Sequence, residues 1–186
     1  YDASGISSEA FDQAVQISSS GTMGLSETMR KKGIELKSSV QPSIFYMAFN
    51  MADPVVGGYS VSAKKLRQAI SIAQNEEEYI SIFMNERGIA AQGPIPPGIF
   101  GYEEGKAGTN KVVYDWVNGK RVRKPLEVAK KLLAEAGYPD GISAKTGKQL
   151  KLFYDSTATG PDDRALMDWR RKQFAKLGIQ LVIRAT

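Results

Sequence analysis

A strand–helix–strand pattern limits the fold of this chain more than any other feature. Residues 149–154 and 179–184 alternate between apolar and polar side chains, which is typical of β-strands. Residues 160–177 between them carry large apolar residues at helical spacing, and Gly178 follows where a helix would end. A crossover of this kind normally joins two parallel strands. The pattern therefore predicts an α/β fold with a mixed sheet and flanking helices.

Several earlier segments have apolar stripes at helical spacing, often next to a residue that suits a helix end. Ser62 would cap the clearest of them, and Asn75 would cap the next. The helices predicted in this way cover residues 7–17, 25–32, 62–73, a segment from Asn75 onward, and 125–136. With 186 residues the chain is long enough to bury a real core, and we expect residues 1–186 to form a single domain.

The segment SIFYMAFN, residues 43–50, is almost continuously apolar and aromatic. Its short length and its polar boundaries predict a strand that is buried on both faces. Residues 34–37 predict a second, shorter strand. The aromatic side chains of the longer segment are expected in the core and not at a ligand.

Residues 86–124 have no sustained period and are rich in glycine and proline. Large apolar residues still occur throughout this stretch, so we expect it to wrap over the domain instead of forming a disordered linker. These residues are Ile95, Ile99, Phe100, Tyr102 and Trp116. The basic run at residues 120–124 is interpreted as a solvated loop.

The chain contains neither histidine nor cysteine, and this excludes several kinds of site. Catalytic triads with a histidine base, disulfides and thiolate metal sites are all impossible. No spacing of three acids predicts a metal site, and no cofactor motif is present. The net charge of +5 is small and spread along the chain, which is not typical of nucleic-acid binders. No apolar run approaches the ~20 residues that span a bilayer.

The loop DSTATGP, residues 155–161, is the candidate ligand site. It leaves the carboxyl end of a predicted strand, where ligands collect in open α/β sheets, and enters the amino end of a helix, which attracts anions. The alternative is that Thr159 only caps this helix and the loop is inert surface. The side chains expected to contact a ligand are Asp155, Ser156, Thr157, Thr159 and, in the first helical turn, Arg164.

Five motifs follow one another along the chain. They are FN at residues 49–50, KLRQAI at 65–70, PIPPG at 94–98 followed by GY, AKKLLAEAGYPDG at 129–141, and FAKLGI at 174–179. In this order and spacing they resemble the second lobe of the extracellular solute-binding proteins of family 5, the oligopeptide-, dipeptide- and nickel-binding components of ABC importers. The resemblance runs from about Phe11 onward. One departure is Lys124, which stands where the family usually has an aspartate.

The resemblance implies a two-lobed periplasmic-binding-protein-like fold, of which this chain would be part of one lobe. It implies a receptor without enzymatic activity or cofactor that captures a peptide or another small solute, such as a nickel chelate, a sugar or an opine. Its partners would be the membrane permease of an ABC importer and the rest of the same solute-binding protein, with no nucleic acid. It would act in the periplasm or outside the cell, held at the membrane by the transporter or a lipid anchor.

The resemblance also places the strand end at Asn50 and Met51 near the ligand cleft. Two alternatives remain open at this stage. One is a fragment of a hydrolase that works with paired carboxylates. The other is a nucleic-acid binder that uses the basic surface at residues 120–124.

Overall fold

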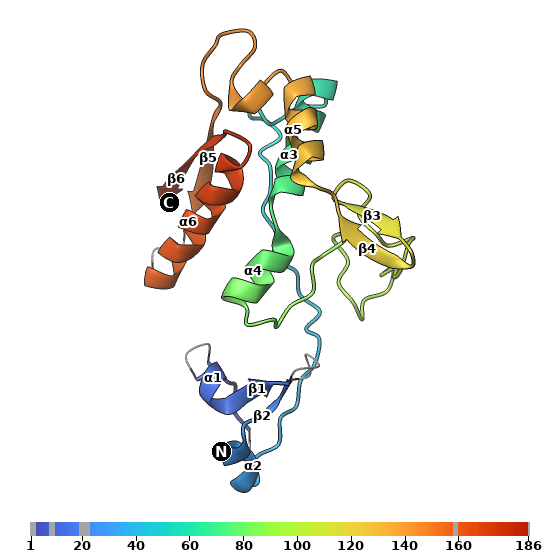
Figure 1. Ribbon diagram of the computed structural model, residues 1–186, viewed down its shortest axis with the longest axis vertical. Coiled ribbons are helices and arrows are strands. Elements are labelled where there is room, and N and C mark those ends of the chain that lie inside the picture. Colours follow the sequence, from blue (N-terminus) through green and yellow to red (C-terminus); the bar gives the residue numbers. More distant parts are fainter. Residues whose placement is uncertain (1–2, 8–9, 19–22, 158–159, 186) are drawn as a thin grey trace. The chain divides into compact units, whose positions relative to one another are not determined.

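The computed structural model describes residues 3–7, 10–18, 23–157 and 160–185 (Figure 1). The chain divides into two compact units. Unit 1 comprises Tyr1–Ser43 with Glu77–Ala90, and unit 2 comprises Ile44–Glu76 with Ala91–Thr186. The candidate ligand site lies entirely in unit 2, so unit 1 is described only briefly.

Unit 1 is built around a small antiparallel hairpin. Strands β1 (Val15–Ile17) and β2 (Met23–Leu25) pair with each other, between helices α1 (Phe11–Ala14) and α2 (Glu27–Lys31), and most of α4 (Glu76–Phe83) belongs to the same unit. Phe11, Ala14 and Val15 are buried, and the guanidinium of Arg87 lies 4.6 Å from the centre of the Phe11 ring.

Two predictions for unit 1 need correction. The helix predicted over residues 7–17 is four residues long, because the β-branched Val15 and Ile17 pair with β2 instead. The strand predicted at residues 34–37 is not formed, and no described strand pairs with this segment. Ile34 and Leu36 are exposed there.

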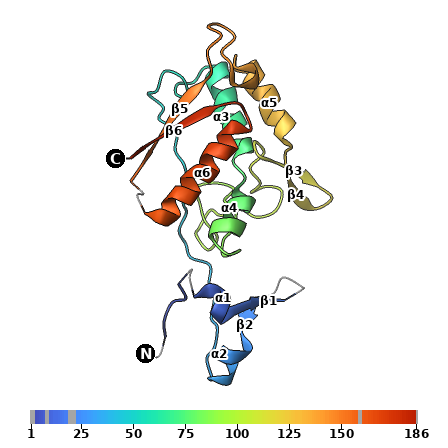
Figure 2. The same ribbon diagram turned by 60° about the vertical axis from the view of Figure 1, so that its left-hand side comes forward.

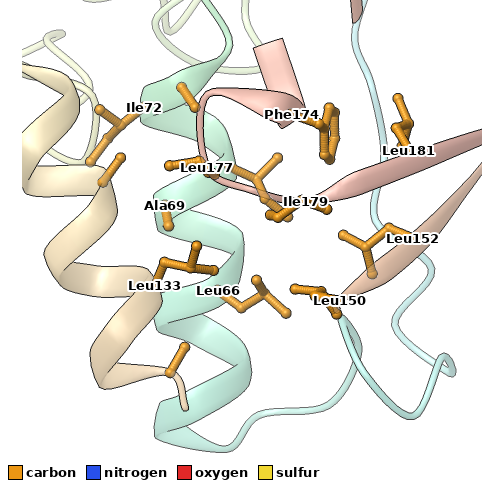
Figure 3. Close-up of a cluster of buried hydrophobic side chains, with 14 residues drawn as sticks. Leu66, Ala69, Ile72, Leu133, Leu150, Leu152, Phe174, Leu177, Ile179 and Leu181 are labelled. Carbon is orange, nitrogen blue, oxygen red and sulfur yellow. The ribbon is translucent and has the colours of Figure 1, made fainter. Parts of the chain in front are cut away.

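The core of unit 2 lies where two helices meet a strand–helix–strand unit (Figure 3). Helix α3 (Val61–Ala73) packs against α5 (Leu126–Glu135), with Ala69 and Ala129 fully buried between them. Small side chains at these positions let the two helices approach closely. The remaining large buried side chains of this core are Leu66, Ile70, Ile72, Leu133, Leu150, Leu152, Phe174, Leu177, Ile179 and Leu181.

The amino end of α3 is capped by Ser60, whose hydroxyl accepts a hydrogen bond from the Ala63 N–H at 3.1 Å. The predicted cap, Ser62, has another role: its hydroxyl donates to the Ala136 carbonyl at 2.6 Å and so ties α3 to the end of α5. The helices expected at residues 62–73 and 125–136 are confirmed within a few residues.

The strand–helix–strand prediction is confirmed. Strands β5 (Lys151–Ser156) and β6 (Gln180–Ala185) are parallel, and α6 (Pro161–Ala175) connects them (Figure 2). Their register places Lys151 opposite Gln180 and Ser156 opposite Ala185. The α/β class is therefore confirmed, although the described strands form three separate two-stranded sheets.

The strand predicted at residues 43–50 is wrong for the described chain. The segment is extended, but no described strand pairs with it, and Phe45 and Tyr46 are 86% and 81% exposed. A strand buried on both faces needs neighbouring strands for its backbone hydrogen bonds, and no described strand supplies them. Only Met47 and Phe49 pack partly against the core of unit 2.

The basic run that was interpreted as a solvated loop is mostly a strand. β3 (Tyr114–Val117) and β4 (Lys120–Arg123) form an antiparallel hairpin. Asn118 and Gly119 connect them with φ angles of 50° and 78°, as in a two-residue type I′ turn. Arg123 donates to the carbonyls of Ile72 and Gln74 at 3.1 and 2.8 Å, so part of this basic run is used inside the fold.

Candidate ligand-binding site

The candidate site is built on the carboxyl ends of β5 and β6, which we call the carboxyl edge; it comprises residues 155–157 and Arg184. Asp155 and Arg184 occupy facing positions of the two parallel strands. Arg184 Nε donates to Asp155 Oδ1 at 2.6 Å, and an Nη atom of the same guanidinium donates to Oδ2 at 2.8 Å. This bidentate geometry matches a planar guanidinium to a planar carboxylate and fixes the orientation of both groups.

The charged pair is accessible from solvent. The side chains of Arg184 and Asp155 are 54% and 52% exposed, and the guanidinium lies 4.9 Å from the centre of the Phe153 ring. The hydrogen bonds from Arg184 lower the pKa of Asp155, and burial opposes this only in part. The same bonds, together with the negative charges of Asp155 and Asp53, raise the pKa of Arg184. Both groups are therefore charged at neutral pH.

Residues 50–58 form a compact turn that carries two of the predicted contacts. Asn50 Oδ1 accepts from the Ala52 N–H at 3.0 Å, and the Met51 carbonyl accepts from the Gly58 N–H at 2.9 Å. Asp53 Oδ1 accepts from the N–H groups of Val55 and Val56 at 2.8 and 2.9 Å. These bonds hold the turn in one conformation, with Asn50 and Met51 exposed on it.

The turn and the carboxyl edge are electrostatically connected. The carboxylate of Asp53 is close enough to contribute to the raised pKa of Arg184. Asp53 follows the predicted contacts Asn50 and Met51 in the turn, and its charge acts on the same guanidinium that binds Asp155. Neither Asp53 nor Arg184 was among the predicted contacts.

The predicted residues do not all face the same way. Ser156 is buried and Thr157 is exposed, whereas Thr159 lies outside the described residues. Arg164 lines a shallow pocket of about 360 Å³ with Met167, Asp168, Arg171 and Ile183. Since Ile183 and Arg184 are consecutive in a strand, they point to opposite faces of the sheet. Arg164 therefore lies on the face that α6 covers, and Asp155 on the other face.

Arg184 had only a weak signal in the sequence. Counting from the first residue of each predicted strand places Asp155 opposite residue 185, one position beyond Arg184, so the charge pair follows only from the register that β5 and β6 adopt. Asp53 had a weaker signal, the Asp-Pro dipeptide that favours a turn. The effect of Asp53 on the pKa of Arg184 had no local signal either, because it depends on where distant segments lie in the fold.

The chemistry of this arrangement is that of a charged, hydrogen-bonding surface. Among residues 3–7, 10–18, 23–157 and 160–185, no group of three acidic side chains is arranged to hold a metal ion. Across the same ranges, no helix has the length and apolar character needed to cross a membrane. The carboxyl edge offers a carboxylate, a guanidinium and a hydroxyl to a polar solute.

Comparison with known proteins gives a family match over nearly the whole sequence. Residues 7–186 match the profile of the bacterial extracellular solute-binding proteins, family 5. A curated relative, heme-binding protein A of Haemophilus influenzae, is 27% identical over 138 residues, which cover 74% of this chain and 21% of the relative.

Solved structures similar to this chain include two periplasmic binding proteins. AgaA from A. tumefaciens R10, in complex with agropinic acid, is 26% identical with a TM-score of 0.49, and the match covers 67% of this chain and 22% of that one. DppA from Helicobacter pylori, in complex with the peptide STSA, is 27% identical with a TM-score of 0.45, and the match covers 69% and 21%.

The chain spans about a fifth of the length of these relatives. The assignment rests on the family profile, which covers both units and every element described above. The chain belongs to family 5 of the bacterial extracellular solute-binding proteins.

Proposed function

We propose that this chain is part of the second lobe of the substrate-binding component of an ABC importer, which captures peptide-like solutes between two lobes outside the cytoplasmic membrane. The observation that carries the proposal is the family match over residues 7–186. The carboxyl edge supports it, because polar groups gather there at the strand ends where α/β proteins bind ligands.

The proposed mechanism is capture by closure. The carboxyl edge and the exposed residues of the turn, Asn50 and Met51, would contact one side of the solute. The rest of the same protein would contact the other side, so that a bound solute favours the closed arrangement of the lobes. Thr157 and Asp155 would supply hydrogen bonds, and Arg184 would hold Asp155 in position.

The proposal includes the cellular setting. The closed receptor would deliver its solute to the membrane permease of the importer, and it would stay near the membrane through that transporter or a lipid anchor. No catalytic step is proposed. The two alternatives are less well supported, because the Asp155 carboxylate is engaged by Arg184 and much of the basic run at residues 120–124 is a strand whose Arg123 bonds within the fold.

The test is native mass spectrometry of the full-length protein that contains this chain, exported and purified without denaturant. We expect a bound mass that disappears on denaturation and fragments as a peptide or a related small solute. If none is retained, isothermal titration with a tri- and tetrapeptide mixture follows. Absence of saturable binding there, together with cleavage of any added peptide, would replace the receptor proposal with an enzyme.

A further inference from the structure

One face of α3 carries a row of polar side chains that has no function in the proposal above. Lys64, Arg67, Gln68 and Ser71 are spaced by three, four and seven residues, so they lie along one side of the helix. They border a shallow groove of about 300 Å³. Its walls are completed by Phe49, from the extended segment before the turn, and by Asn110 and Val112, which precede β3.

The groove is held in shape by its own hydrogen bonds. An Nη atom of Arg67 donates to the Val56 carbonyl at 2.5 Å, and the Ser71 hydroxyl donates to the Arg67 carbonyl at 2.9 Å. Asn110 Oδ1 accepts from the Val112 N–H at 3.0 Å. Arg67, Gln68 and Ser71 are half-buried, so their positions are constrained by neighbours as well as by these bonds.

The groups left open in the groove are mainly donors. Within the part of the chain that the structure describes, the Lys64 ammonium has no ion-pair partner. The other guanidinium N–H groups of Arg67 and the side-chain amide N–H groups of Gln68 and Asn110 are also unused there. No acidic residue lines the groove, although the chain contains 20 of them.

We propose that this groove binds the anionic group, a carboxylate or a phosphate, of a small solute. The cations are Lys64 and Arg67, one helical turn apart, and the amides are Gln68 and Asn110. These donors match a carboxylate or phosphate, which only accepts hydrogen bonds and forms its strongest ones with charged donors. The volume lies at the lower end of small-molecule sites, which fits a compact anion better than a long peptide. Phe49 and Val112 offer apolar contact for the body of such a solute.

The site differs from the carboxyl edge, where the Arg184 guanidinium is already bound by the Asp155 carboxylate. Its occupation does not depend on the importer proposal. An anion there would contact α3, the extended segment and the approach to β3 at once, and would link elements that are distant in the sequence.

The test is isothermal titration of the full-length protein at about 50 mM salt, with inorganic phosphate and succinate as separate probes. Lys64→Glu places a negative charge at the groove and removes a cation. Lys130→Glu makes the same change on an exposed face of α5 and is the matched control. We expect saturable binding of at least one probe, weakened about fivefold to tenfold by Lys64→Glu and unchanged by Lys130→Glu.

Binding of phosphate alone or of succinate alone would identify which anion the groove prefers, and Gln68→Glu should weaken the same probe. Raising the salt concentration should also weaken it, because the cations are accessible to solvent. No saturable binding of either probe would overturn the proposal, as would an equal effect of Lys64→Glu and Lys130→Glu. If the full-length protein bound the anion but no peptide, the importer proposal would be rejected and the anion site would stand.

Discussion

Arg184 donates hydrogen bonds to both carboxylate oxygens of Asp155, which occupies the facing position of the neighbouring parallel strand. The pair lies one position before the last residues of β5 and β6, so Asp155, which was predicted as the start of the ligand loop, belongs to the strand. The side chains are about half exposed, so water screens part of their attraction. The main effect of the pair is to orient the two side chains, because a bidentate bond fixes two planar groups relative to each other.

The first prediction concerns the pH dependence of this pair. Arg184 lowers the pKa of Asp155, so the folded chain binds that proton more weakly than the unfolded chain. The resulting stability is present above about pH 4, the ordinary range of an aspartate, and is lost as pH falls through the lowered pKa. Urea unfolding should therefore show that Arg184→Met is less stable than the parent at pH 7, and that the difference in unfolding free energy shrinks as pH falls below about 4.

A matched control uses the other end of the same strand. Lys151 is exposed at the start of β5, so Lys151→Met also removes one positive charge and adds an apolar side chain. It should show no comparable pH dependence. An unchanged difference between Arg184→Met and the parent across this pH range would mean that packing on Phe153, and not the charge of Asp155, sets the effect.

The second prediction concerns the core between α3 and α5. Leu133 is fully buried there, whereas its neighbour Leu132 is only partly buried. Leu133→Ala should lower the free energy of unfolding by about 2–5 kcal/mol, because a cavity remains where the side chain was. Leu132→Ala should cost clearly less in the same urea titration. Equal losses would show that α5 does not pack on α3 through the face described.

The third prediction concerns two glycines that lie backbone to backbone. A Cβ atom on Gly178 would overlap the Asp140 carbonyl, and one on Gly141 would overlap the Gly178 carbonyl. Both residues also have positive φ angles, 71° and 78°. Gly178→Ala should therefore cost about 2 kcal/mol or more in stability. Gly93→Ala, where a Cβ meets nothing, should have little effect on the urea midpoint.

The local parts of this fold were predictable from the sequence. The alternation at β5 and β6, and the apolar stripes of α3 and α5, each report burial within a single element. Gly178 was correctly placed after α6, but its close approach to the Tyr138–Gly141 turn was not predicted. That contact joins residues far apart in the sequence, and periodicity carries no information about such contacts.

The failures have two different causes. The β3–β4 hairpin was missed although Asn118-Gly119 is a strong turn signal, because the surrounding glycines and prolines masked its short strands. The apolar segment at residues 43–50 has the composition of a strand, but composition does not supply a pairing partner. At the site, Asp155 was predicted from its place after a strand, whereas Arg184 required the register between two strands.

The last prediction concerns the turn that carries Asn50 and Met51. The Gly57 N–H donates to the Asp53 carbonyl at 2.9 Å, and a Cβ atom on Gly57 would overlap the carbonyl oxygens of both Asp53 and Met51. Gly57→Ala must therefore open the turn, at a cost of about 1–3 kcal/mol. It should also displace Asp53, whose charge acts on Arg184 at the carboxyl edge.

Two measurements separate these effects. Urea unfolding of Gly57→Ala should show the loss of stability, again with Gly93→Ala as the control. In the full-length protein at a temperature where the variant stays folded, titration with the solute found by mass spectrometry should show weaker binding. Full affinity in a folded but destabilised Gly57→Ala variant would remove Asn50 and Met51 from the proposed site and leave the carboxyl edge as its remaining part in this chain.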